Sequence, residues 1–156
     1  MDSKLVTDAW LKALVSGSYT QTKGALYCNT KRSGSSNFKG GLPGHCCLGV
    51  LGDILVKMYP ERFSWLDAED GIGFMKLLDS EEEVMAPVTA MLPQSLWRDM
   101  GLPFDQGVLI SLNDTKNESF AAIAAYIEER QYADKALPGK SSEESDEGLE
   151  QVAASA

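Results

Sequence analysis

The amino-acid sequence predicts a compact α+β domain that is mainly helical and carries a small β-element. Two segments, one near each end of the folded part, have the 3.6-residue apolar period of an amphipathic helix. A third stretch, residues 45–58, is apolar around much of its circumference, which is typical of a helix in the core. Short apolar runs at residues 25–28 and 63–66 are the candidates for the β-element.

The first helix is expected to begin at Ser3, a favourable N-cap residue, and to end at Gly17. The last helix has two candidate caps, because Thr115 and Glu118 have capping-box spacing and Asn117 is a rival. Apolar side chains then recur on one face of each helix. These are Val6, Trp10, Ala13 and Leu14 in the first, and Phe120, Ile123, Ala124 and Ile127 in the last.

The apolar stretch 45–58 is expected to be a buried helix that ends at Tyr59-Pro60. Gly49 and Gly52 lie on adjacent turns of one side of this helix. Because glycine destabilises a helix interior, we expect a second element to approach closely there. The sequence therefore predicts a tight contact between this helix and another part of the chain.

The middle of the chain is less clearly patterned. Residues 25–28 are a candidate strand that pairs with a later segment, and residues 63–66 pack back or pair. Residues 67–91 are ambiguous, with a possible short helix at 80–85. Residues 93–100 are predicted as a short helix that ends at Gly101, whereas residues 108–112 fit either a strand or a helix.

The 156 residues correspond to a single domain, which we place at residues 3–132. Residues 133–156 are expected to form a disordered acidic tail, because too few apolar side chains are present to offset the entropy of ordering it. No apolar run is long enough to span a membrane, and no secretory signal is visible at the N-terminus. These features, with three cysteines and no export signal, predict a cytoplasmic protein.

The net charge of −9 is unevenly distributed. Residues 67–83 carry a net charge of −6, and residues 17–44 carry +4 with no acidic residue. An acidic protein is a poor candidate for coating DNA, because binding to the phosphate backbone requires cationic surface. Direct DNA binding is therefore disfavoured, although a local phosphate site remains open.

The cysteines are not expected to be catalytic or to bind metal. His45 precedes Cys46 and Cys47, but neighbours in a helix point about 100° apart, so a Cys–His dyad is disfavoured. With Cys28 these residues also lack the spacing of a zinc site, and a disulfide between adjacent cysteines would be strained. We therefore expect no metal or cofactor, and we expect these cysteines to pack as small apolar residues.

A polar Gly/Ser loop before the buried helix is a candidate anion site. Lys31, Arg32 and Lys39 would be its cationic contacts, although the loop does not match a P-loop. Asn113 and Asp114, before the last helix, are further candidate ligand contacts. Both residue types also form Asx-turns and caps, and the capping role is the favoured interpretation.

Several motifs lie along about residues 8–130: Trp10-x-x-Ala13-Leu14-x-Ser16-Gly17-x-Tyr19-x-Gln21, Gly24-x-Leu26, Cys46-Cys47-Leu48-Gly49-Val50-Leu51, Leu112-Asn113-Asp114 and Ser119-Phe120-x-x-Ile123-Ala124-x-x-Ile127-Glu128. Taken together, these motifs resemble a family of small uncharacterised proteins of tailed bacteriophages and prophages. The family often has another cysteine after the central block, where this chain has Gly52-Asp53. The resemblance implies a phage origin and the cytoplasm of the infected bacterium, but no settled activity.

These observations lead to a prediction of a non-enzymatic phage accessory protein that binds a host protein in host takeover or anti-defence. Its expected contacts are the acidic side chains of the −6 segment, namely Asp79, Glu81, Glu82 and Glu83. The alternative is a binder or hydrolase of a small phosphorylated ligand such as a nucleotide, held by the basic loop with Asn113 and Asp114.

Overall fold

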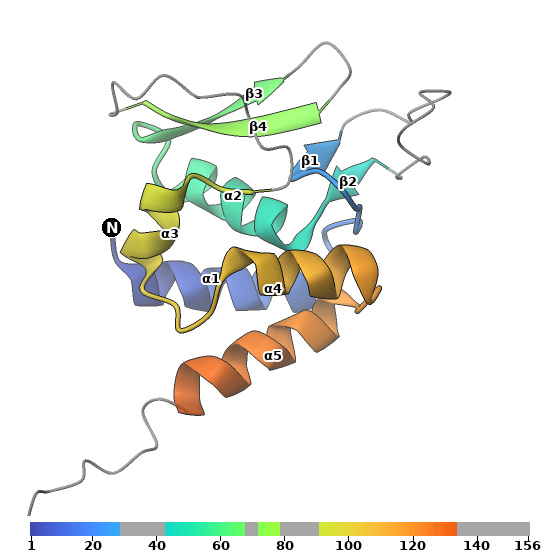
Figure 1. Ribbon diagram of the computed structural model, residues 1–156. Coiled ribbons are helices and arrows are strands. Elements are labelled where there is room, and N and C mark those ends of the chain that lie inside the picture. The colour runs from blue at the N-terminus through green and yellow to red at the C-terminus, as the bar shows by residue number, and fades with distance from the viewer. Residues whose placement is uncertain (29–42, 68–71, 79–90, 134–156) are drawn as a thin grey trace, which may run out of the picture.

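The computed structural model describes residues 1–28, 43–67, 72–78 and 91–133, and it confirms the α+β fold that is mainly helical (Figure 1). The elements in chain order are α1 (Ser3–Val15), β1 (Tyr27–Cys28), β2 (Gly44–His45), α2 (Cys47–Met58), β3 (Phe63–Asp67), β4 (Ile72–Leu77), α3 (Gln94–Met100), α4 (Gln106–Ile110), the π-helical turn η1 (Ser111–Thr115) and α5 (Phe120–Ala133). The predicted tail and the possible helix at 80–85 lie outside the described residues.

The strands form one antiparallel sheet in the order β2-β1-β4-β3. Strand β1 lies between β2 and β4, so Tyr27 is opposite His45 on one side and Gly73 on the other. The expected strand at 25–28 is thus confirmed at its last two residues, and 63–66 pairs as β3. Strand β4 lies in the middle of the sheet within the segment that the sequence left ambiguous.

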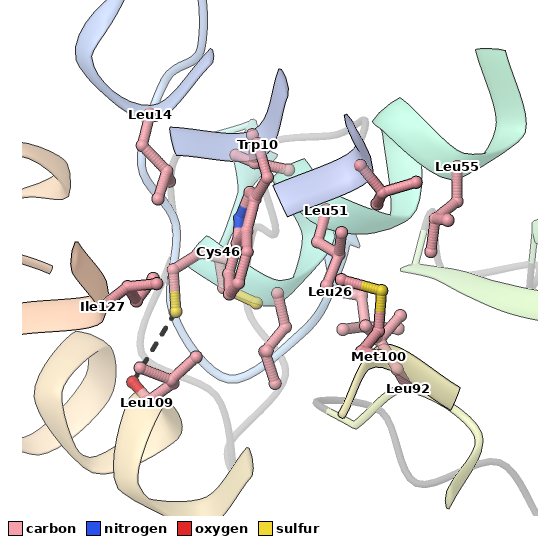
Figure 2. Close-up of a cluster of buried hydrophobic side chains, with 14 of the residues drawn as sticks. Trp10, Leu14, Leu26, Cys46, Leu51, Leu55, Leu92, Met100, Leu109 and Ile127 are labelled. Carbon is pink, nitrogen blue, oxygen red and sulfur yellow. Dashed lines mark hydrogen bonds between the residues drawn. The ribbon is translucent and has the colours of Figure 1, made fainter. Parts of the chain in front are cut away.

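The sheet covers one side of α2, and α1 and α5 follow on the side of α2 away from the sheet (Figure 1). Buried side chains from the five α-helices and from the segments just before β1 and α3 meet between these layers, including Trp10, Leu14, Leu26, Leu51, Leu55, Leu92, Met100, Leu109 and Ile127 (Figure 2). The indole Nε1 of Trp10 donates a hydrogen bond to the carbonyl oxygen of Cys47 at 2.9 Å, which joins α1 to the first turn of α2. This bond satisfies the polar atom of a fully buried tryptophan.

The close approach predicted at the two glycines of α2 is confirmed. An added Cβ at Gly49 would lie 1.6 Å from the carbonyl oxygen of Leu26. A Cβ at Gly52 would lie 2.8 Å from the Trp65 ring and 3.0 Å from the methyl carbon of Met75. The glycines therefore let the chain before β1 cross α2 at one turn and let the sheet rest on α2 at the next.

The starts of the first two long helices differ from the sequence-based prediction. The N-cap of α1 is Asp2, whose carboxylate accepts a hydrogen bond from the Leu5 amide, so the assignment of Ser3 as N-cap was wrong. Helix α2 begins at Cys47, and His45 belongs to β2 instead of to the helix. Pairing with Tyr27 accounts for this difference, because a cross-strand partner is not visible in the local sequence.

The C-terminal region resolves one open alternative and corrects another prediction. Residues 108–112 are helical, because they lie in α4 and the start of η1. Helix α5 begins at Phe120, and the Ser119 hydroxyl accepts a hydrogen bond from the Ala122 amide at 3.2 Å. The predicted caps Thr115 and Asn117 were therefore wrong, since Thr115 belongs to the preceding π-turn.

Among the described residues, no helix is long and apolar enough to cross a membrane.

Candidate functional site

Four rings from separate parts of the chain form a continuous row, here called the ring row (Tyr19, His45, Tyr27 and Trp65). His45 lies edge-on to Tyr19, with ring centroids 5.2 Å apart, and partly over Tyr27 at 4.7 Å. Tyr27 in turn lies 5.7 Å from Trp65. All four rings are partly exposed. The row is therefore not part of the closed core, although it borders it.

The sheet register explains why these rings meet. Tyr27 and His45 are direct cross-strand partners, so their side chains emerge on the same face of the sheet. The ring of Tyr27 passes over Gly73, where an added Cβ would lie 2.5 Å from Tyr27 Cδ1. Gly73 thus gives Tyr27 room to approach Trp65 on β3, whose ring rests against α2 at Gly52.

A charged group adjoins the Tyr19 end of the ring row. The Tyr19 hydroxyl donates a hydrogen bond to Asp53 Oδ2 at 2.5 Å, and Lys57 Nζ lies 2.7 Å from the same oxygen. Lys57 Nζ also donates to the Tyr19 hydroxyl oxygen at 3.3 Å and sits 5.6 Å from the ring centroid. One carboxylate oxygen therefore joins a tyrosine to a lysine one turn further along α2.

These contacts determine the direction of each pKa shift. Burial alone would raise the pKa of Asp53, but the hydrogen bonds from Lys57 and Tyr19 outweigh it and hold that pKa below its usual value. The pKa of Lys57 is raised by its hydrogen bond to Asp53, and the pKa of Tyr19 is raised by burial and by the same carboxylate. Burial lowers the pKa of His45, which keeps the imidazole neutral at pH 7.

The cysteines next to His45 are buried and have the properties of packing residues. Burial raises the pKa of Cys46 to about 12, and it raises the pKa of Cys47 well above its usual value. The Cys46 sulfur accepts a hydrogen bond from the Gly49 amide at 3.4 Å as the N-cap of α2, and Cys47 Sγ donates to the Leu109 carbonyl oxygen at 3.6 Å. Both side chains belong to the hydrophobic core, which confirms the packing expected from the sequence, and protonated, buried thiols are poor nucleophiles.

Of the predicted ligand contacts, Asn113 and Asp114 are described, and both are engaged within the protein. Asn113 is fully buried in η1, and its amide binds the segment before β1 and the start of α2. Asp114 accepts hydrogen bonds from the Gly24 amide and from Asn113 Nδ2. Neither residue caps the last helix, so the favoured capping interpretation was wrong: both residues precede α5 by a whole turn and face the chain before β1.

The other predicted contacts lie outside the described residues. They are Lys31, Arg32 and Lys39 for the ligand, and Asp79, Glu81, Glu82 and Glu83 for the partner protein. Chain connectivity still relates the basic segment to the ring row, because in the sequence it lies between β1, which carries Tyr27, and β2, which carries His45. Within the described ranges, no three His, Cys, Asp or Glu side chains gather in a way that could hold a metal ion.

The ring row was not anticipated from the sequence. One signal was available: Asp53 and Lys57 are four residues apart on a predicted helix, which is the spacing of an ion pair. The meeting of rings from residues 19, 27, 45 and 65 has no local signature, because it depends on strand register.

Comparison of the chain with models of known protein families, with curated proteins and with solved structures finds no match.

Proposed function

We propose that this protein is a non-enzymatic binding protein that contacts a protein of a bacterial host through the face that carries the ring row. The observation that supports this most is the composition of that face. Three of its rings are tyrosine or tryptophan and are partly exposed beside an ion pair. Tyr and Trp are enriched among the residues that dominate binding energy in protein interfaces.

The state of the charged groups favours a protein partner over a phosphorylated ligand. The charge of Lys57 is already neutralised by Asp53, and the amide of Asn113 is occupied by protein partners. Lys57 is thus already paired with a carboxylate, and the buried amide of Asn113 has no hydrogen-bonding position left for a phosphate. Binding of a nucleotide would depend on the basic segment outside the described residues, with Lys31, Arg32 and Lys39 as its contacts.

The proposal keeps the acidic residues Asp79, Glu81, Glu82 and Glu83 as a second part of the contact surface. Acidic side chains at the rim of an interface accelerate association and select partners of opposite charge. The resemblance to small phage proteins supports a bacterial host as the source of the partner. A host protein with a basic rim and a cavity for an aromatic side chain is the kind of partner this surface fits.

The test is capture from bacterial lysate on the immobilised full-length protein, with quantitative mass spectrometry of what is retained. Tyr27→Ala should remove a specific partner, and its matched control is Tyr126→Ala, which removes a partly exposed ring on α5. The partner should then bind the purified protein in isothermal titration calorimetry, at least tenfold more weakly with Tyr27→Ala. The proposed contact is wrong if the partner binds both variants equally.

The acidic residues are tested in the same assay with a charge-matched pair of variants. E81Q/E82Q/E83Q should slow association and weaken capture, whereas E118Q/E128Q/E129Q removes three exposed acids elsewhere and should not. Equal capture by both triple variants would exclude the acidic segment from the interface.

A nucleotide screen tests the alternative directly. A ligand that binds only the folded state raises the unfolding temperature, so millimolar ATP, GTP and their diphosphates are sufficient probes. We expect no shift. A shift that disappears in K31A/R32A/K39A would replace the protein-binding proposal with a phosphorylated-ligand site.

A further inference from the structure

A single buried side chain, Asn113, connects three parts of the chain around the ring row. Its Oδ1 accepts hydrogen bonds from Gln21 Nε2 at 2.9 Å and from the Cys47 amide at 3.3 Å. Its Nδ2 donates to the Thr22 carbonyl oxygen at 2.8 Å and to Asp114 Oδ1 at 2.7 Å. Every hydrogen-bonding position of the amide is thus occupied, on a residue with no exposed surface.

The segment that Asn113 holds also fixes the backbone of His45. The His45 amide donates to the Thr20 carbonyl oxygen, and the Thr22 amide donates to the His45 carbonyl oxygen, both at 2.9 Å. On its other side His45 pairs with Tyr27. The same segment carries Tyr19 at its start, so the positions of two of the four rings depend on where residues 19–22 lie.

We infer that Asn113 is the positioning residue of the ring row: it holds residues 20–22 and the start of α2 together and so fixes the placement of Tyr19 and His45. The inference concerns the proposed contact face and rests on the proposed function only for its effect on binding. Asn113 lies in a π-helical turn, which is a rare form of helix that occurs often at functional sites. It contacts no partner itself, since it is fully buried.

Gln106 provides a matched control for the loss of a buried amide. It is 1% exposed, and it donates to the Leu92 carbonyl oxygen at 3.0 Å and accepts from the Leu92 amide at 2.9 Å. It lies on α4, next to η1 in the chain. Its hydrogen bonds fix the residue just before α3 and do not involve the segment before β1. Removal of either amide leaves buried backbone groups unpaired, so both variants should lose stability.

The test uses the fact that His45 is the single histidine of the chain, which makes its ring signals in NMR unambiguous. In Asn113→Ala the His45 ring protons should change chemical shift, because ring currents of Tyr19 and Tyr27 act on them, and the His45 pKa should move toward its usual value. In Gln106→Ala both should stay as in the parent protein. Gln21→Ala should change the His45 ring shifts and pKa in the same direction as Asn113→Ala, but by less. It serves as the test variant if Asn113→Ala does not fold.

The outcomes separate this inference from the proposed function. Unchanged His45 signals in both Asn113→Ala and Gln21→Ala, or an equal change in Gln106→Ala, overturn the positioning role. If the signals change as expected, Gln21→Ala should also lower the affinity for the captured partner severalfold. Altered signals with unaltered binding would leave the positioning role standing and overturn the ring row as the contact face.

Discussion

The carbonyl oxygen of Leu26 lies where any side chain at position 49 would begin, 1.6 Å from the ideal Cβ position of Gly49. The contact joins the chain just before β1 to the first turns of α2. It is reinforced by the Cys46 amide, which donates a hydrogen bond to the same Leu26 oxygen at 3.1 Å. This crossing places β1 and the ring row on α2.

Gly49→Ala should therefore destabilise the protein severely. The obstacle is backbone, which has no alternative rotamer, so the two segments must separate, and we expect a loss of at least about 3 kcal/mol. Gly17→Ala is the control, because Gly17 has a φ of +73° but open space around it. Its backbone strain alone should cost about 1–2 kcal/mol. Urea unfolding of both variants measures the difference, and equal losses would contradict the backbone contact.

The hydrogen bond between Tyr19 and Asp53 should stabilise the folded protein measurably. A bond to an ionised carboxylate contributes about 1.5–3 kcal/mol when shielded, and partial exposure reduces that figure. A double-mutant cycle with Tyr19→Phe and Asp53→Ala should give a coupling free energy of about 1 kcal/mol. Asp53→Asn keeps an acceptor for Tyr19, so it should lose less stability than Asp53→Ala. A coupling energy near zero would show that the pair is not formed in solution.

Stability should decline as the pH falls below the usual His45 pKa of about 6.5. Burial lowers the pKa of His45 in the folded protein, so the unfolded chain binds the proton more readily. The free energy of unfolding therefore decreases from about pH 6.5 downward until the folded pKa is passed. His45→Gln should flatten the curve in this window. The contribution of Asp53 is separate, because its lowered pKa matters only in strongly acidic solution.

Cys46 and Cys47 should resist alkylation in the native protein. Both are buried, and burial keeps their thiols protonated at pH 8. Iodoacetamide labelling followed by mass spectrometry should show modification of these two residues only as fast as the protein unfolds, and immediate modification in guanidinium. Rapid labelling of either residue in the native protein would contradict the prediction and would show an accessible, reactive thiol at this position.

The helices were predictable because their signal is local. Val6, Trp10 and Leu14 are buried on one face of α1, as are Ile123 and Ile127 on α5, and the 3.6-residue period alone indicates these faces. The boundaries were less accurate. The first helix is capped by Asp2 and not by Ser3, and the last helix by Ser119 and not by Thr115. Several neighbouring polar residues can serve as a cap, and only the backbone angles of the folded chain select one of them.

Strand β4 was missed for a physical reason. Ile72 and Met75 are both buried, yet they face opposite sides of the sheet because their separation is odd. A central strand with apolar residues on both faces has no alternation that distinguishes it from other short apolar runs. Strand β2, with only two residues, has too short a pattern to be recognised without its partner β1.

The sequence by itself determined the main helices, the close approach at Gly49 and Gly52, and the burial of Cys46 and Cys47. Each of these follows from spacing within one segment or from the chemistry of one residue type. The tertiary structure decided that His45 lies in a strand, that four rings meet, and that Asn113 bonds to Gln21, 92 residues away. Such contacts depend on strand register and on where segments of the chain cross. They join residues that are far apart in the sequence, so the local pattern around each residue does not indicate its partner.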